Sequence, residues 1–465
     1  MLTYDMEDRG RTPLYEYLYR CIREDIRSGA LPPGEKLPSK RALAEHLRVS
    51  VITVESAYAQ LEAEGYVRSE PRRGFFAARL EPVPAKGQEA APPLPQAAPP
   101  RTYRADLKSN RVDPARFPFA TWSRLMRQVL SEEDTNLLQP IPSQGVEALR
   151  RAIAGHLHSY RGLTISPEQI LVGAGTEYLY QLLIQLLGPE LGFAVEDPGY
   201  PKIRQVYGKC GVRCCPVPLD SQGMDLTALS ASGATAAHLS PSHHYPTGLV
   251  TPIGRRQALL QWAQDRNAVI IEDDYDSEFR FSGLPIPTLQ SIDAGGRVIY
   301  MNTFSQTISP SMRVGFMVLP PALLERWRRE LDFYACTVPA LEQHVLARFL
   351  AGGHYEQHLS RMRKEYRLRR ARVLEAFRTG PFAGRVSIAE EGAGLHFLLH
   401  LDTACTDEAL RRRAESLGAR LGFLSEYAAA PAPAYAHTLV INYAGLAQDR
   451  LAEAVELLAQ VFQED

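Results

Sequence analysis

The alternation of apolar and polar residues predicts three helices and a hairpin near the start of the chain. Apolar positions recur at helical spacing from Pro13 to about Ser28, and again in the two stretches that follow Ser39 and Ser50. Serine hydroxyls accept hydrogen bonds from the free backbone N–H groups of a first helical turn, so we expect both later serines to be helix caps. Residues 66–78 place turn-forming residues between two apolar segments, which predicts a hairpin. Short helices joined by a tight turn and followed by a hairpin indicate a winged helix-turn-helix.

From about residue 103 the pattern changes to short apolar runs separated by helical stretches. The runs typical of buried strands are residues 170–173, 192–197, 268–274, 297–302 and 315–319. Residues 177–187 form one of the helical patterns between them. This alternation predicts an α/β domain with a large, mostly parallel sheet, whose ligand site lies at the carboxyl ends of the strands.

A proline-rich segment separates the two patterns. Residues 81–100 contain seven prolines and no aromatic residue, which is typical of a semi-extended linker. The predicted organisation is therefore a winged-helix domain at 12–80, a linker at 81–102 and a large domain at 103–465.

Composition narrows the function without choosing it. The formal net charge of −1 allows a local basic patch but excludes a generally basic nucleic-acid-binding protein. The chain has no run of about 18 apolar residues and no apolar signal core at its charged N-terminus, so we expect a cytoplasmic protein with no membrane partner. Its six cysteines lack the paired clusters of a metal site, and we expect thiols and no bound metal.

The N-terminal module has the sequence features of a DNA-binding domain. The segments Leu-Pro-Ser-Lys-Arg-Ala-Leu-Ala (residues 37–44) and Leu-Glu-Ala-Glu-Gly-Tyr-Val (residues 61–67) resemble the GntR-type DNA-binding domain, and the resemblance covers nearly all of residues 12–78. It implies a recognition helix in the major groove, phosphate contacts at the start of the second helix, and a wing along the DNA backbone or minor groove. The residues expected at a double-stranded DNA operator are Ser39, Lys40, Arg41, Ser50, Thr53, Ser56, Arg72, Arg73 and Gly74.

One position departs from that family's pattern. Val51 stands where many GntR relatives carry an arginine directly after the capping serine. A base-reading arginine is therefore absent, and Thr53 or Ser56 would have to supply the specificity. The alternative for each charged residue of the module, taken alone, is an ordinary solvated side chain.

The segment Met-Asn-Thr-Phe-Ser-Gln-Thr-Ile-Ser-Pro-Ser-Met-Arg-Val-Gly-Phe (residues 301–316) is the most informative part of the large domain. It resembles the segment that carries the Schiff-base lysine in fold-type I enzymes that use pyridoxal 5'-phosphate (PLP). In such segments a Ser-Lys pair precedes a phosphate-binding arginine, seven residues after the lysine. Arg313 stands in the place of that arginine, while Gln306 occupies the lysine position.

Further residues at predicted strand and helix ends match the needs of PLP. Gly175 and Thr176 open a helix whose free N–H groups could hold a phosphate. Asp273, at the end of an apolar strand, could pair with a protonated pyridine nitrogen, and Tyr275 could hydrogen-bond the phenolate. The cofactor site that the resemblance implies consists of Gly175, Thr176, Tyr200, His243, Asp273, Tyr275, Ser305, Gln306 and Arg313.

The glutamine argues against catalysis. An amide cannot form an imine, because its nitrogen lone pair is delocalised into the carbonyl, and it cannot act as the base of transamination. No lysine lies between residues 210 and 363, which leaves Lys202, near Tyr200, as the only plausible substitute. Some relatives also place a carboxylate-binding arginine on a strand near the C-terminus, and residues 421–449 contain none. We therefore expect no catalytic residue, and PLP bound non-covalently if it is bound.

The whole chain, from about residue 12 to 465, resembles the MocR/GabR-type transcriptional regulators, and Glu-Asp-Asp-Tyr-Asp-Ser-Glu-Phe-Arg (residues 272–280) is a particularly specific string of that family. The resemblance implies a homodimer, an operator and a small-molecule effector, either PLP or an amino compound. Three alternatives stay open. They are a sensor of free PLP, a PLP-dependent aminotransferase with an accessory DNA-binding head, and a plain repressor whose body only dimerises. The sequence does not distinguish a natural glutamine at 306 from an engineered one.

Overall fold

The computed structural model describes residues 2–80, 102–110, 112–281, 286–379, 381–382, 384–389, 394–446 and 450–462. The chain divides into two compact units, Met1–Pro100 and Arg101–Asp465. Except for residue 102, the predicted linker lies outside the described residues.

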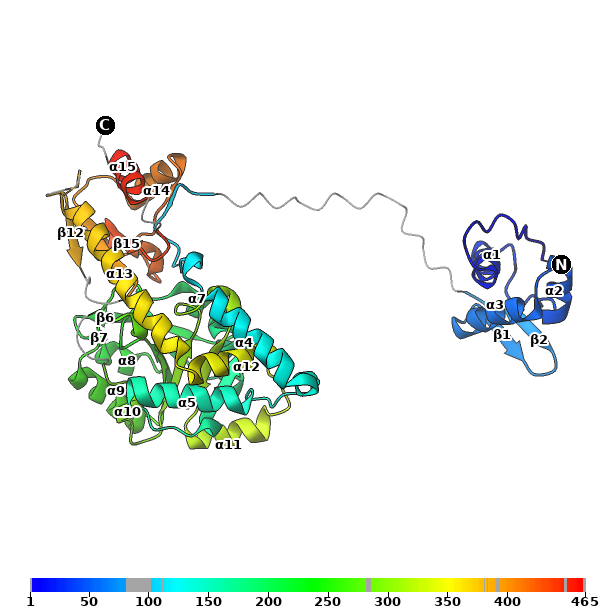
Figure 1. Ribbon diagram of the computed structural model, residues 1–465, viewed down its shortest axis with the longest axis horizontal. Coiled ribbons are helices and arrows are strands. Elements are labelled where there is room, and N and C mark those ends of the chain that lie inside the picture. Colours follow the sequence, from blue (N-terminus) through cyan, green and yellow to red (C-terminus); the bar gives the residue numbers. More distant parts are fainter. Residues whose placement is uncertain are drawn as a thin grey trace. The chain divides into compact units, whose positions relative to one another are not determined.

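The N-terminal unit is a winged helix-turn-helix, as predicted (Figure 1). Its helices and strands are α1 (Leu14–Ser28), α2 (Lys40–Leu47), α3 (Val51–Ala63), β1 (Val67–Glu70) and β2 (Gly74–Ala77). Both predicted caps form: the Ser39 hydroxyl accepts from the backbone N–H of Ala42 at 3.2 Å, and the Ser50 hydroxyl accepts from that of Thr53 at 3.1 Å. One apolar cluster joins the three helices and the hairpin, with fully buried Tyr58 among its members.

The large unit is built on an eight-stranded mixed sheet of order β4-β11-β10-β9-β8-β5-β6-β7. The strands are β4 (Ile170–Gly173), β5 (Phe193–Asp197), β6 (Cys214–Asp220), β7 (Gly223–Met224), β8 (Ala236–Leu239), β9 (Val269–Asp273), β10 (Val298–Thr303) and β11 (Gly315–Val318). The neighbours from β10 to β6 pair in parallel, whereas β11 and β7 run antiparallel to their neighbours. The five predicted strands are therefore present, and the sheet's parallel centre determines where its ligand site lies.

Helices cover both faces of this sheet, which explains the continuous apolar runs of its strands. Alternate residues of one strand enter different cores: Val172 of β4 packs with α4, α5 and α12, whereas Leu171 packs with α6, α7 and α11. The helices of the unit up to residue 379 are α4 (Phe119–Glu132), α5 (Glu147–Arg161), α6 (Thr176–Leu187), α7 (Pro201–Lys209), α8 (Leu226–Ala231), α9 (Ile253–Asp265), α10 (Leu289–Ile292), α11 (Pro321–Glu330), α12 (Ala340–Ala351) and α13 (His354–Thr379).

A smaller subdomain completes the unit beyond α13 (Figure 1). It contains the antiparallel sheet β12-β13-β15 and a short parallel pair, β14 with β3. Its elements are β3 (Ala105–Asp106), β12 (Val386–Ala389), β13 (His396–Leu401), α14 (Asp407–Ser416), β14 (Ala419–Arg420), β15 (Thr438–Asn442) and α15 (Leu451–Val461). The β3–β14 pair brings residues from the start of the large domain beside residues more than 300 positions later.

Candidate functional site

A cavity of about 790 Å³ lies at the carboxyl ends of the parallel strands, where the alternation of strands and helices predicted a ligand site. Its size is in the range of ordinary small-molecule sites. The predicted cofactor residues that line it are Thr176, Tyr200, Asp273, Tyr275, Ser305, Gln306 and Arg313. Gly175 lies directly behind this lining, and His243 is outside it.

Two cationic side chains, Arg313 and Lys202, lie near the N-terminus of α6 in the cavity wall. Gly175 precedes this helix with φ +83° and offers no side-chain cap, so the first N–H groups remain available to a ligand. A Cβ atom at Gly175 would lie 2.9 Å from Cζ of Arg313, so only glycine lets the guanidinium lie against the helix end. Arg313 Nη2 is 2.7 Å from Oε2 of Glu177, and Nζ of Lys202 is 2.5 Å from Oε1 of the same carboxylate. Lys202 and then Arg313 lower the pKa of Glu177, and the two cations together with the open helix end suit a phosphate that competes with this carboxylate.

Asp273 ends β9 as a buried carboxylate with one unpaired oxygen. Its Oδ2 accepts from the Tyr180 hydroxyl at 2.6 Å and lies 3.4 Å from Nε2 of His238. Its Oδ1 has no hydrogen-bond partner among the described residues, although Asp273 is only 5% exposed. A buried acceptor without a donor is costly, so this oxygen is suited to a ligand N–H such as that of a protonated pyridine ring.

Tyr275 lines the cavity, and the buried imidazole of His243 lies against its hydroxyl. The Tyr275 hydroxyl is 3.3 Å from Nδ1 of His243, which lies 2.9 and 3.0 Å from the two carboxylate oxygens of Asp276. The expectation that His243 belongs to the cavity needs correction, because its loop turns the ring toward Asp276 and away from the lining. His396 packs beside it, with ring centroids 4.9 Å apart, and burial lowers the pKa of His396.

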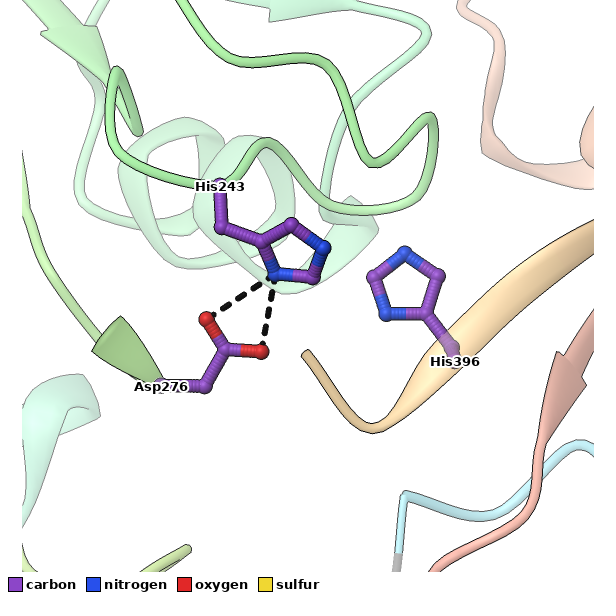
Figure 2. A group of neighbouring side chains, drawn as sticks. All are labelled: His243, Asp276 and His396. Carbon is purple, nitrogen blue, oxygen red and sulfur yellow. Dashed lines mark hydrogen bonds and ion pairs between the residues drawn. The ribbon is translucent and has the colours of Figure 1, made fainter. Parts of the chain in front are cut away.

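Among the described residues, His243, Asp276 and His396 also form the one group with donor atoms close enough to suggest a metal ion, all within 4.8 Å. Figure 2 shows that both carboxylate oxygens already face the His243 ring. The hydrogen-bonded pair accounts for this geometry, so the group is better understood as support for Tyr275.

Gln306 lies on the cavity wall with its Oε1 buried and without a partner among the described residues. Two lysines share this cavity. Lys202 is the one that the sequence suggested, and Lys108 was missed. The β3–β14 pairing brings Lys108 to the cavity, the side chain of Asn442 donates to its carbonyl at 3.0 Å, and Glu426 holds its Nζ at 2.6 Å. No local motif marks Lys108, so nothing in the sequence could have identified it.

Two arginines that the sequence did not suggest also line the cavity. Arg420, at the end of β14, donates to the Ser109 hydroxyl at 3.2 Å. Arg204, on α7, donates to the carbonyl of Tyr427 at 2.9 Å. The arginine-free strand near the C-terminus is β15, so any carboxylate on a ligand would have to meet these cations from other elements.

Glu196 adds a buried acid to the lining. It accepts from the backbone N–H of Ser240 at 2.9 Å, and burial raises its pKa to about 8. His244 lies behind it, with Nε2 3.5 Å from the carboxylate, and burial lowers the pKa of this imidazole to about 3. Both groups are therefore uncharged at neutral pH, and this wall of the cavity adds little net charge.

In the N-terminal unit the predicted operator residues lie at the start of α2, at the start of α3 and on the wing. Arg41 is exposed, and Lys40 forms an ion pair of 2.6 Å with Glu55 of α3. The wing tip turns at Arg72 (φ +62°) and Gly74 (φ +115°), which leaves Arg72 and Arg73 exposed.

The two candidate specificity residues on α3 differ in their availability. The Thr53 hydroxyl is 2.8 Å from that of Ser50 and takes part in the helix cap, so it is already engaged. Ser56, one turn later, is exposed. Of the two residues that the sequence offered for base contacts, Ser56 is the one whose hydroxyl is exposed and makes no hydrogen bond within the part of the chain that the structure describes.

Comparisons with known proteins agree with both units. The family model "Bacterial regulatory proteins, gntR family" matches residues 14–77, and "Aminotransferase class I and II" matches residues 106–458. The chain is 36% identical to the HTH-type regulator YdeL of Bacillus subtilis (strain 168) over 452 residues, which is 96% of each chain. It is 33% identical to the probable rhizopine catabolism regulatory protein MocR of Rhizobium meliloti over 477 residues, covering 99% of this chain and 96% of the relative. It is 34% identical to the pyridoxine biosynthesis regulator PdxR of Corynebacterium glutamicum, with 84% of each chain covered.

Solved aminotransferases share the fold of the large unit. Kynurenine aminotransferase of Pyrococcus horikoshii matches with a TM-score of 0.68 at 24% identity, covering 77% of this chain and 90% of that one. The α-aminoadipate aminotransferase LysN of Thermus thermophilus, solved with N-(5'-phosphopyridoxyl)-L-leucine, matches with a TM-score of 0.66 at 26% identity, covering 77% and 91%. The chain therefore belongs to the MocR-type family of transcriptional regulators, in which a GntR helix-turn-helix domain precedes a domain of aminotransferase class I and II.

Proposed function

We propose that this protein is a transcriptional regulator whose aminotransferase-like domain binds PLP, or an amino compound, reversibly and without catalysing transamination. Membership of the MocR-type family supports the regulatory role. The name of the Corynebacterium relative, a regulator of pyridoxine biosynthesis, makes PLP the effector to test first.

The polar groups around the cavity fit PLP. Arg313, Lys202 and the open end of α6 would hold its phosphate. The unpaired Oδ1 of Asp273 would accept from the ring nitrogen, and Tyr275 would donate to the phenolate oxygen. When bound, PLP supplies an aldehyde carbon and an electron-withdrawing ring.

The observation that carries the proposal is Gln306 on the wall of this cavity. Its amide keeps the shape and polarity of the wall but cannot attack an aldehyde, so binding is retained while covalent chemistry is lost. The two cavity lysines are both held in ion pairs, Lys202 with Glu177 and Lys108 with Glu426, which makes both amines poor nucleophiles.

The proposal includes a cytoplasmic homodimer that presents two DNA-binding heads to an operator with two half-sites. A symmetric dimer of helix-turn-helix proteins presents two recognition helices, and its operator then contains two half-sites. Light scattering on residues 101–465 tests the dimer, and a monomeric mass at micromolar concentration would remove it from the proposal.

The decisive experiment for the effector domain is borohydride treatment of the full-length protein with PLP, followed by peptide mass spectrometry. We expect no phosphopyridoxyl adduct on the wild-type chain and loss of the cofactor on dialysis. The Gln306→Lys variant should instead retain PLP at position 306 in stoichiometric yield.

Lys108 and Lys202 are the internal controls of this experiment. A stoichiometric adduct on either lysine of the wild-type chain would overturn the non-covalent assignment. It would favour the alternative, a PLP-dependent aminotransferase with an accessory DNA-binding head. Replacing both lysines by arginine in the Gln306→Lys background should leave the new adduct intact.

A further inference from the structure

The recognition helix α3 has an unusual chemical character for a helix that enters the major groove. Its sequence from Val51 to Ala63 contains no lysine or arginine, so the commonest specific contact, an arginine paired with guanine, is not available from it. The nearest arginine, Arg48, ends α2 in a left-handed conformation and is not part of the helix.

Apolar side chains take the place of that arginine. Ile52 is 73% exposed and Val51 43% exposed, and both lie in the first turn of α3, the part of a recognition helix that contacts base edges. The packed face of the helix is formed by Val54, Ala57 and Tyr58; Ile52 lies opposite this face, and the less exposed Val51 lies at its margin. Isolated exposed aliphatic residues are common, and what distinguishes these two is their position at the DNA-reading end of the helix.

A polar neighbour, Glu55, also makes contact between this face and guanine unfavourable. Glu55 lies one turn after Val51, and its carboxylate is held by Lys40 at 2.6 Å. A carboxylate repels the two acceptors that guanine presents in the major groove, O6 and N7, and tolerates amino groups. Around this face the exposed wing arginines and Arg41 supply the charge that holds DNA phosphates.

We propose that Ile52 and Val51 read DNA by apolar contact with the C5-methyl groups of thymines, so that operator specificity depends on methyl groups and not on guanine. Thymine is the one standard base whose major-groove edge offers an apolar group. This inference rests on the DNA-binding role of the head and goes beyond it by naming the base feature that is recognised.

The experiment uses operator duplexes selected from a randomised double-stranded DNA pool by the full-length protein. Each thymine of the selected sequence is then replaced by deoxyuridine, which removes only the methyl group, and affinity is measured by fluorescence anisotropy. We expect at least one thymine per half-site whose methyl group is worth about fourfold in affinity, the effect of burying one methyl-sized apolar group. As a second comparison, cytosine and 5-methylcytosine are placed at the same position. The duplex with 5-methylcytosine should bind more tightly than the one with cytosine, because it carries the methyl group.

Variants assign the methyl contact to a side chain. Ile52→Ala or Val51→Ala should abolish the thymine–deoxyuridine difference at one position. The slope of log affinity against log salt should keep its wild-type value, because it reports phosphate contacts that neither side chain makes. Thr53→Ser is the matched control, because it removes a neighbouring methyl group and keeps the hydroxyl that completes the helix cap.

The possible failures are distinguishable. If no selected thymine shows a methyl effect, or if the effect survives both alanine variants and is lost in Thr53→Ser, methyl reading by Ile52 and Val51 is wrong although the protein binds DNA. Methyl reading is equally wrong if selection yields guanines whose recognition depends on Arg48. If the full-length protein enriches no sequence at all, both this inference and the proposed regulatory function fail.

Discussion

Replacing Asp273 by asparagine tests the effector site most directly. The side chain lines the cavity and is 5% exposed, its Oδ2 is engaged by Tyr180, and its Oδ1 is buried without a donor among the described residues. A ligand N–H that met this oxygen would form a charge-assisted hydrogen bond, which contributes about 1.5–3 kcal/mol. Asp273→Asn should therefore weaken PLP binding by about 10- to 150-fold.

The assay is calorimetric titration of PLP into dialysed protein, with inorganic phosphate as a second ligand. Phosphate should bind the variant as it binds the wild type, because the cations that hold it lie around Glu177 at the other end of the cavity. Asp265→Asn, the same chemical change at an exposed site on α9, is the control variant and should bind PLP normally. Asp273→Asn should be no less stable than the wild type without ligand, since its amide oxygen can still accept from Tyr180 and the buried oxygen without a donor is removed. A change in PLP affinity of less than twofold for Asp273→Asn would refute the assignment of Asp273 to the ring nitrogen.

Three further predictions concern ionisable side chains. Glu177→Gln frees Lys202 and Arg313 from two partly exposed ion pairs of at most about 1 kcal/mol each, so inorganic phosphate should bind about three- to tenfold more tightly in calorimetry. Weaker binding would show that Glu177 orders the cations and does not compete with phosphate. Burial raises the pKa of Glu196 to about 8 from a value of 4.5, so the folded protein binds the extra proton between these values and loses stability as pH rises through this window. The difference in unfolding temperature, Glu196→Gln minus wild type, should accordingly increase as the pH is raised from 5 to 8. A difference that stays constant over this range would contradict the prediction. Replacing both Arg72 and Arg73 by alanine should weaken binding to every DNA sequence. It should also lower the slope of log affinity against log salt by about one for each phosphate that is no longer bound. An unchanged slope would place the wing away from the DNA backbone.

The tertiary structure shows where side chains point, which the sequence left open. His243 lies in the loop that the sequence indicated, but its ring turns to Asp276 and supports Tyr275 from behind. Thr53 lies at the start of the recognition helix as expected, yet its hydroxyl is bound to the cap residue Ser50. Side-chain direction depends on the partners that packing provides, and a sequence pattern does not contain them.

By itself, the sequence determined the features that depend on near neighbours. The caps at Ser39 and Ser50, the winged hairpin and the alternation of strands and helices all follow from residue types within a few positions of one another. The position of a ligand site at the strand ends also follows, because parallel strands must direct the same ends to one edge of the sheet. The chemical incapacity of Gln306 is a property of the residue itself.

Only the tertiary structure decided which distant residues share the cavity. Lys108 and Arg420 reach it because β3 pairs with β14 across more than 300 residues, and no local pattern encodes that pairing. Glu177 lies between Lys202 and Arg313 because two helix ends and a loop meet at the same strand edge. The physical reason is common to these cases: local preferences arise from backbone conformation, whereas the composition of a site arises from the packing of segments that are far apart in the chain.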